Sequence, residues 1–188
     1  MSDEIRDFLR LPKRHASKLE SEPSAADGAQ LAKAQSVRDA IMAALIVVVL
    51  FSALWSILSA LIGRIFPWMT LILGFLIGLS VRRAGQGLDW RFPTIAASMA
   101  ALGALAGNVV VAATFTAIVL DTTTLTVLRA VTTMTWPVFF DEVLTPADAI
   151  FALFAAAIAA SYANRRLTRA EFIALRKWGK EQEDAERS

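Results

Sequence analysis

Few side chains in the long apolar stretches of this sequence could do chemistry, and most of those are hydroxyls. One amide, Asn108, lies near the middle of the apolar stretch 93–120, and Thr114 and Thr116 follow it. An amide in hydrocarbon is costly unless it is hydrogen-bonded. Asn108 is therefore expected to bond across to a neighbouring helix, or else to line a polar path. Asn108, Thr114 and Thr116 are the candidate lining residues of a pore.

No catalytic set is recognisable among the residues of the chain. The single histidine, His15, lies in a polar segment far from the serines of the apolar stretches, which therefore have no base to activate them. These serines are Ser52, Ser56, Ser59, Ser98 and Ser161. With no cysteine, thiol catalysis and thiolate metal sites are excluded. We expect no catalytic residue, no bound metal and no cofactor.

Acidic residues gather outside the apolar stretches or at their ends. Asp121, Asp141 and Glu142 come between the third and fourth of them, and Asp148 lies at the outer end of the fourth; a hard cation could bridge these carboxylates. Helix capping and solvated loops explain these acids better. Apart from Asp148 in the first turn of the fourth stretch, no Asp, Glu, Lys, Arg or His occurs between the ends of any apolar stretch. Proton relays and ion-coupled carriers need such groups, so the sequence disfavours these mechanisms.

The composition predicts a membrane protein. Of 188 residues, 56% are hydrophobic and 19% are charged, and the apolar residues form runs of about twenty without a charge. This pattern argues against a soluble enzyme and a disordered protein. A formal net charge of only +2 leaves no broad basic surface, so we expect no nucleic-acid partner.

The expected fold is all-α with four transmembrane helices, at about 40–63, 65–81, 93–120 and 146–163. Residues 1–30 are expected to form a flexible cytoplasmic tail that contains a short amphipathic helix and a mobile linker up to Gln30. Residues 31–166 are expected to form the membrane domain. Residues 167–188 are expected to form a charged helical tail on the cytoplasmic side.

Residues 122–144 lie between the third and fourth spans and do not resemble another span. Arg129, Asp141, Glu142 and seven threonines oppose insertion. On a helical projection, Val127, Leu128, Val131, Met134 and Val138 share one face. The segment is therefore expected to be amphipathic and to lie on the outer surface or to re-enter the membrane.

The distribution of basic residues predicts the orientation. The first 39 residues hold seven basic residues, the loop 82–92 holds three and the tail from Asn164 holds seven, whereas the opposite side has only Arg64 and Arg129. Because basic loops stay in the cytoplasm, both termini are predicted to be cytoplasmic. Arg82, Arg83, Trp90 and Arg91 would then lie at the level of anionic lipid headgroups and are candidate headgroup contacts. Gly85 and Gly87 beside them suggest a turn with positive φ.

Small residues recur at a spacing of four in every predicted span. The pairs Gly74/Gly78 and Gly103/Gly107 are the clearest, and with Asn108 they are the candidate helix-packing residues. Small residues allow close approach of helices in lipid, where no hydrophobic force drives the helices together. They could pack the helices of one chain or form an interface between copies of it.

One stretch resembles a pattern found in a group of small bacterial inner-membrane proteins that are mostly uncharacterised. It reads Gly78-x-x-Val81-Arg82-x-Ala84-Gly85-x-Gly87, then Arg91-Phe92, Ile95-Ala96-Ala97 and Leu102-Gly103-x-x-x-Gly107-Asn108. The resemblance implies a bacterial cytoplasmic membrane and the same span–loop–span unit, and it implies no known activity.

Three functions are consistent with these features. The leading hypothesis is a non-catalytic membrane interaction or accessory protein that assembles with itself or with another membrane protein. The first alternative is a conduit for a small solute or ion, formed by several protomers around the polar third span. The least favoured is an enzyme that acts on lipid headgroups with the outer acids.

Overall fold

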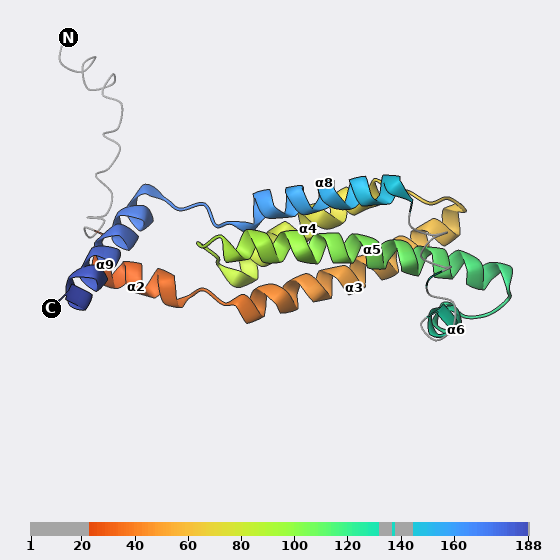
Figure 1. The fold of residues 1–188 in the computed structure, drawn as a ribbon, viewed down its shortest axis with the longest axis horizontal. Coiled ribbons are helices and arrows are strands. Elements are labelled where there is room, and N and C mark those ends of the chain that lie inside the picture. The colour runs from red at the N-terminus through yellow and green to blue at the C-terminus, as the bar shows by residue number, and fades with distance from the viewer. Residues whose placement is uncertain (1–22, 132–136, 138–144, 188) are drawn as a thin grey trace, which may run out of the picture. The chain divides into compact units, whose positions relative to one another are not determined.

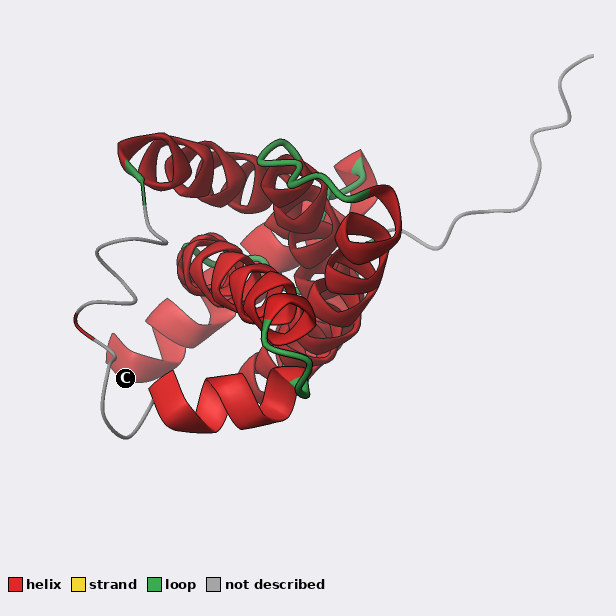
Figure 2. Cartoon of the chain, turned by 90° about the vertical axis from the view of Figure 1, so that its right-hand side faces the viewer, coloured by secondary structure: helices red, strands yellow, loops and turns green. Residues whose placement is uncertain are grey.

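The computed structural model describes residues 23–131, 137 and 145–187, and the described residues form helices and loops without a strand (Figures 1 and 2). The helices are α2 (Ala25–Lys33), α3 (Val37–Ile62), α4 (Met69–Gly85), α5 (Arg91–Val119), α6 (Thr124–Ala130), α8 (Pro146–Ala163) and α9 (Arg169–Arg187). The chain divides into two compact units. The larger unit is residues 35–166, and the smaller unit combines the described parts of 1–34 and 167–188.

In the larger unit, α4 and α5 pack against each other, and each of them also packs against both α3 and α8. Successive helices run in opposite directions (Figure 1). The core between them is built mainly from alanines of α3, α5 and α8, which surround Leu73, Ile77 and Val81 of α4. Small side chains let the helix backbones approach closely, so that van der Waals contact holds the unit together.

Three described helices, α3, α5 and α8, are long and apolar enough to cross a membrane. They correspond to the first, third and fourth predicted spans, and α8 has the predicted bounds. The predicted second span corresponds to α4, which has 17 residues. A helix of this length measures about 26 Å.

The bounds of α4 differ from the prediction at both ends. Residues 66–68 form a turn, in which the amide of Met69 donates to the carbonyl of Phe66, so the helix begins later than expected. At its other end the helix continues through Arg82 and Arg83 to Gly85.

The prediction of positive φ at Gly85 and Gly87 is wrong. Among the residues around this turn, Gln86 has the positive φ, at 47°. Both glycines are needed because they lie against the ring of Phe92: a Cβ on Gly85 would come within 2.7 Å of that ring, and a Cβ on Gly87 would come closer still. A side chain at either position would displace Phe92, which is fully buried.

The helices of the larger unit differ in how far they extend. Asn108 of α5 contacts Asp148, the third residue of α8, although α5 continues for eleven residues beyond Asn108. At 1.5 Å per residue, α5 extends about 16 Å beyond this level. Figure 1 shows both α3 and α5 reaching past the start of α8.

The predicted amphipathic segment begins as α6, which packs on the extended end of α5. Val127 and Val131 are buried against Ala113 and Ala117, while Arg129 is exposed. This is the apolar face expected from the sequence. The rest of the segment, which includes Met134, Val138, Asp141 and Glu142, lies outside the described residues.

The smaller unit is formed by α2 and α9, which pack against each other. A mobile linker was expected up to Gln30, but residues 25–30 belong to helix α2. The helix forms because Ser24 and Asp27 make a capping box. It packs on α9 because Gly28 has no side chain: a Cβ there would lie 2.7 Å from the carbonyl carbon of Ala174. The predicted short helix near the start of the chain lies outside the described residues.

Candidate functional site

Polar side chains from three helices form two contacts inside the larger unit, one between α3 and α5 and one between α5 and α8. One stripe of α3 presents Ser52, Trp55, Ser56 and Ser59, whose spacing of three and four residues places them on the same helix face. Asn108 and Thr114 of α5 and Asp148 of α8 complete the set. We call these seven residues the polar seam. It contains the predicted pore residues Asn108 and Thr114.

The Asn108 amide joins α5 to α8. Its Nδ2 donates to Oδ1 of Asp148 at 3.1 Å. The second carboxylate oxygen, Oδ2, accepts from the backbone amide of Thr145 at 2.9 Å and from its hydroxyl at 2.6 Å. Thr145 caps α8, so the cap that starts the helix also orients the Asp148 carboxylate toward Asn108. Both oxygens of this carboxylate are therefore hydrogen-bonded.

A second contact joins α3 to α5 through hydroxyl groups. The oxygens of Ser56 and Thr114 lie 2.7 Å apart. The hydroxyl of Thr114 also bonds to the carbonyl of Val110 at 2.8 Å. A hydroxyl has one hydrogen to donate, so when Thr114 donates to Val110 it accepts from Ser56. It also accepts from the hydroxyl of Thr124 at 3.3 Å.

Three buried polar atoms of the seam have no hydrogen-bond partner. They are Oγ of Ser52, Oγ of Ser59 and Nε1 of Trp55. An unsatisfied buried group costs about 1–3 kcal/mol. A serine hydroxyl can turn to a carbonyl of its own helix, as Ser161 does with Ala157. The rigid indole of Trp55 is only 1% exposed and has no such option. The seam therefore offers donors that a bound polar molecule could satisfy.

The seam contains groups for binding and lacks a pair for catalysis. Its members supply hydroxyls, an amide, an indole N–H and one carboxylate, and none of them is an imidazole or a cation. Among the described residues, no three His, Cys, Asp or Glu side chains lie close enough to hold a metal ion. The chemistry available at this place is hydrogen bonding to a neutral polar molecule, or attraction of a cation to Asp148.

The predicted helix-packing glycines all lie at helix contacts within the chain. A Cβ on Gly74 would lie 2.8 Å from Cα of Ala155, and one on Gly78 would lie 2.7 Å from the carbonyl oxygen of Ala159. Both glycines thus bring α4 against α8. On α5, Gly103 faces Val48, and Gly107 faces Trp55 and Ser52. These contacts use the small-residue surfaces inside one chain.

The other predicted site residues lie apart from the seam. Thr116 bonds to the carbonyl of Ala112 in its own helix at 3.0 Å. Arg82 is half-buried, whereas Arg83, Trp90 and Arg91 are exposed. These four flank the loop between α4 and α5, at the opposite end of α5 from α6 (Figure 1).

The loop between α4 and α5 is tied to its neighbours by hydrogen bonds. The carbonyl of Gly87 accepts from the amide of Arg165 at 3.1 Å, and the amide of Leu88 donates to the side chain of Gln35 at 3.2 Å. The loop thus joins the segments that precede α3 and follow α8.

Sequence reasoning missed five members of the seam. Asp148 was expected to be only a helix cap among the outer acids, and Trp55 was not singled out. The serines of α3 were considered only as nucleophiles. The spacing 52, 55, 56 and 59 is visible in the sequence and could have indicated a polar face. The position of Asp148 along the bundle could not be predicted from the sequence, because it depends on how far α8 is displaced along α5.

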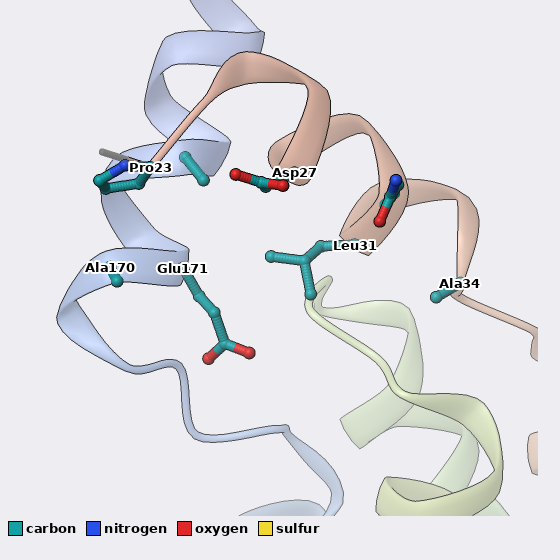
Figure 3. A pocket seen from close by; sticks show the side chains of 8 residues that line it. Pro23, Asp27, Leu31, Ala34, Ala170 and Glu171 are labelled. Atoms are coloured by element: carbon teal, nitrogen blue, oxygen red, sulfur yellow. The ribbon is translucent and has the colours of Figure 1, made fainter. Parts of the chain in front are cut away.

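A separate pocket of about 480 Å³ lies between α2 and α9 in the smaller unit (Figure 3). Its lining is mostly apolar, with Leu31 in its wall and the acids Asp27 and Glu171 beside it. Both acids already serve as helix caps, since Asp27 bonds to Ser24 and Glu171 bonds to Thr168. The hydrogen bonds from the Ser24 backbone and hydroxyl hold the pKa of Asp27 below its ordinary value of 3.8.

Comparison of the chain with known protein families, curated proteins and solved structures finds no match.

Proposed function

We propose that this chain is a four-span protein of the bacterial cytoplasmic membrane, with α3, α4, α5 and α8 as its spans and both termini in the cytoplasm. The antiparallel order of these helices and the concentration of basic residues on one side support this topology. Large apolar side chains on α3 are exposed from Met42 to Ile62. These 20 residue steps measure about 30 Å, which matches the hydrocarbon thickness of a bilayer.

This placement puts Ser52 at the bilayer centre and the rest of the α3 stripe, as far as Ser59, within about 10 Å of it toward the outer side. Ser52 is midway between Met42 and Ile62, and it lies beside Gly107, which precedes Asn108. Polar and ionisable groups at this depth are expensive and usually mark a path or site for a ligand. Asp148 contacts Asn108 and so lies near the same depth, which means that α8 begins inside the bilayer and not at its outer edge. Ion-linked mechanisms were disfavoured because no acid was expected at this depth, and Asp148 removes that objection.

The function that the geometry supports best is passage or binding of a small polar solute or cation within the bundle of one chain. The carrying observation is that buried donors, above all Nε1 of Trp55, are unsatisfied on the α3 stripe that contacts Gly107 and Thr114 of α5. A path inside one bundle differs from the path between several protomers that the sequence suggested. Asn108 is buried between helices of its own chain, which favours the former.

Flux into liposomes tests this proposal. Purified protein would be reconstituted, and the entry of glycerol, sodium ions and protons would be measured against empty liposomes. We expect the Asn108→Leu variant to lose most of the protein-dependent flux, because it removes the amide from the seam. Thr116→Val is the matched control, since Thr116 bonds only to the carbonyl of its own helix in the described contacts. Equal flux in wild type, Asn108→Leu and empty liposomes would refute the proposal.

Assembly with another membrane protein is the second candidate function. The observation that favours it is the exposed apolar surface where α3 and α5 extend past α8: Leu61 is 80% exposed and Val119 is 82% exposed. Crosslinking in native membranes followed by mass measurement tests this candidate. Crosslinked complexes that Leu61→Ser prevents would support it, and monomers alone at native expression would count against it.

A further inference from the structure

Helix α9 has two faces with different environments in the smaller unit. Ala174 is buried against α2, and a Cβ on Gly28 of α2 would lie 2.9 Å from Cβ of Trp178. The face around Ala174 and Trp178 is therefore occupied by α2.

The opposite face of α9 combines large apolar side chains with cations. At 100° per residue, five side chains fall within an arc of about 100° centred roughly opposite Ala174. They are Arg169, Phe172, Ile173, Arg176 and Lys180. Phe172 is 60% exposed and Ile173 is 38% exposed. We call this set the basic face.

Acidic residues are kept away from the basic face over residues 169–180. The only acid there, Glu171, lies on the α2 side of the helix and accepts hydrogen bonds from the amide and hydroxyl of Thr168. The remaining acids of α9 are Glu181, Glu183, Asp184 and Glu186, all after Lys180. Apart from Arg187 in the last turn, the cations of α9 thus lie in its first three turns, next to the apolar side chains.

We propose that the basic face binds the anionic phospholipid surface of the membrane, with Phe172 and Ile173 inserted at the headgroup level. Apolar side chains flanked by Lys and Arg are what a helix lying in the membrane interface needs, and anionic lipid attracts each cation. The position in the chain fits, because five residues separate the end of α8 from the beginning of α9. This inference depends on the proposed insertion of α8 and is independent of flux through the seam.

The experiment uses the full chain in lipid nanodiscs. Because the protein has no cysteine, a spin label on Ile173→Cys reports one position. Its collisions with oxygen, which dissolves in lipid, and with a water-soluble nickel complex give its depth. Phosphatidylcholine discs are compared with discs that contain one-third phosphatidylglycerol. A label on Gln182→Cys, among the acids, serves as the control position.

We expect the label at position 173 to move into lipid only in the anionic discs, and the label at position 182 to stay in water in both. Each cation near an anionic surface contributes about a factor of five to binding. Arg176→Gln should therefore lower the bound-to-free ratio about fivefold. Neutralising Arg169, Arg176 and Lys180 together should lower it about 100-fold, whereas Arg187→Gln in the acidic segment should leave it unchanged.

Three outcomes would overturn the inference. Equal immersion in neutral and anionic discs would show that charge does not direct the contact. Protection of position 173 from both oxygen and nickel would indicate burial against a protein, either a second copy or another partner. An equal effect of Arg187→Gln and Arg176→Gln would show that the basic face is not the binding surface. None of these results would change the liposome flux, so failure here is distinct from failure of the proposed conduit.

Discussion

Gly78→Ala should weaken the contact between α4 and α8 more than Gly103→Ala weakens the contact between α5 and α3. A new Cβ would lie 2.7 Å from its nearest neighbour in both variants. At Gly78 that neighbour is the backbone carbonyl oxygen of Ala159, whereas at Gly103 it is a methyl group of Val48. Ordinary contact begins at 3.4 Å. Helices α4 and α8 must therefore separate by about 0.7 Å, whereas at Gly103 only the Val48 side chain has to shift, within the narrow range that its restricted χ1 allows.

The expected cost follows from this difference. Overpacking costs about 1–3 kcal/mol, and replacing glycine by alanine within a helix returns up to about 1 kcal/mol. Gly78→Ala should lower the free energy of unfolding by up to about 2 kcal/mol, whereas Gly103→Ala should lower it clearly less or raise it by up to about 1 kcal/mol. Reversible unfolding in mixed micelles with increasing SDS, followed by tryptophan fluorescence, measures both. The reasoning is refuted if Gly103→Ala costs as much as Gly78→Ala.

Three further predictions follow from single contacts. Asn108→Leu should lower the free energy of unfolding in the same micelles by about 0.6–1.7 kcal/mol, which is the range for a hydrogen bond between membrane helices. An unchanged free energy of unfolding would mean that the contact between Asn108 and Asp148 is not formed. Phe92→Ala should cost about 3–5 kcal/mol in that assay, because it empties the space against which the glycines of the α4–α5 loop pack. Ser24→Ala should return the pKa of Asp27 upward toward 3.8, measured by carboxyl NMR. Since the pKa of Asp27 is lowered in the folded protein, its bond to Ser24 stabilises α2 above about pH 4 and loses this effect as the pH falls through the folded pKa. An unchanged Asp27 pKa in Ser24→Ala would contradict the assignment of Ser24 as the cause of the shift.

The sequence predicts the helices of the larger unit well where local signals mark their ends. Helix α8 has the predicted bounds because Thr145, Pro146 and Asp148 form a complete N-terminal cap. Helix α3 ends one residue before the predicted bound, where Gly63 adopts a φ of 69°. The end of helix α4 is less well predicted. Arg82 and Arg83 were expected to begin a polar loop, but the helix continues through both residues to Gly85.

What the sequence could not predict depends on contacts between distant segments. Helix α2 is stable as part of a pair, because Gly28 fits against Ala174 about 150 positions later in the chain. The polar seam depends on the relative displacement of α3, α5 and α8. Asn108 was identified as a polar group that needs a partner, but no local pattern indicates that the partner is Asp148.

The central claim is that water reaches a polar seam inside helices whose outer faces are in lipid. Thr114 lies on the seam and bonds to Ser56, whereas the next residue of α3, Ile57, is 59% exposed on the apolar face. Positions 57 and 114 therefore lie at a similar depth, with position 114 inside the helix bundle and position 57 on its outer surface. Treatment of intact cells with a charged, membrane-impermeant thiosulfonate should modify Thr114→Cys and leave Ile57→Cys unmodified. Modification of Ile57→Cys, or of neither variant, would contradict the account.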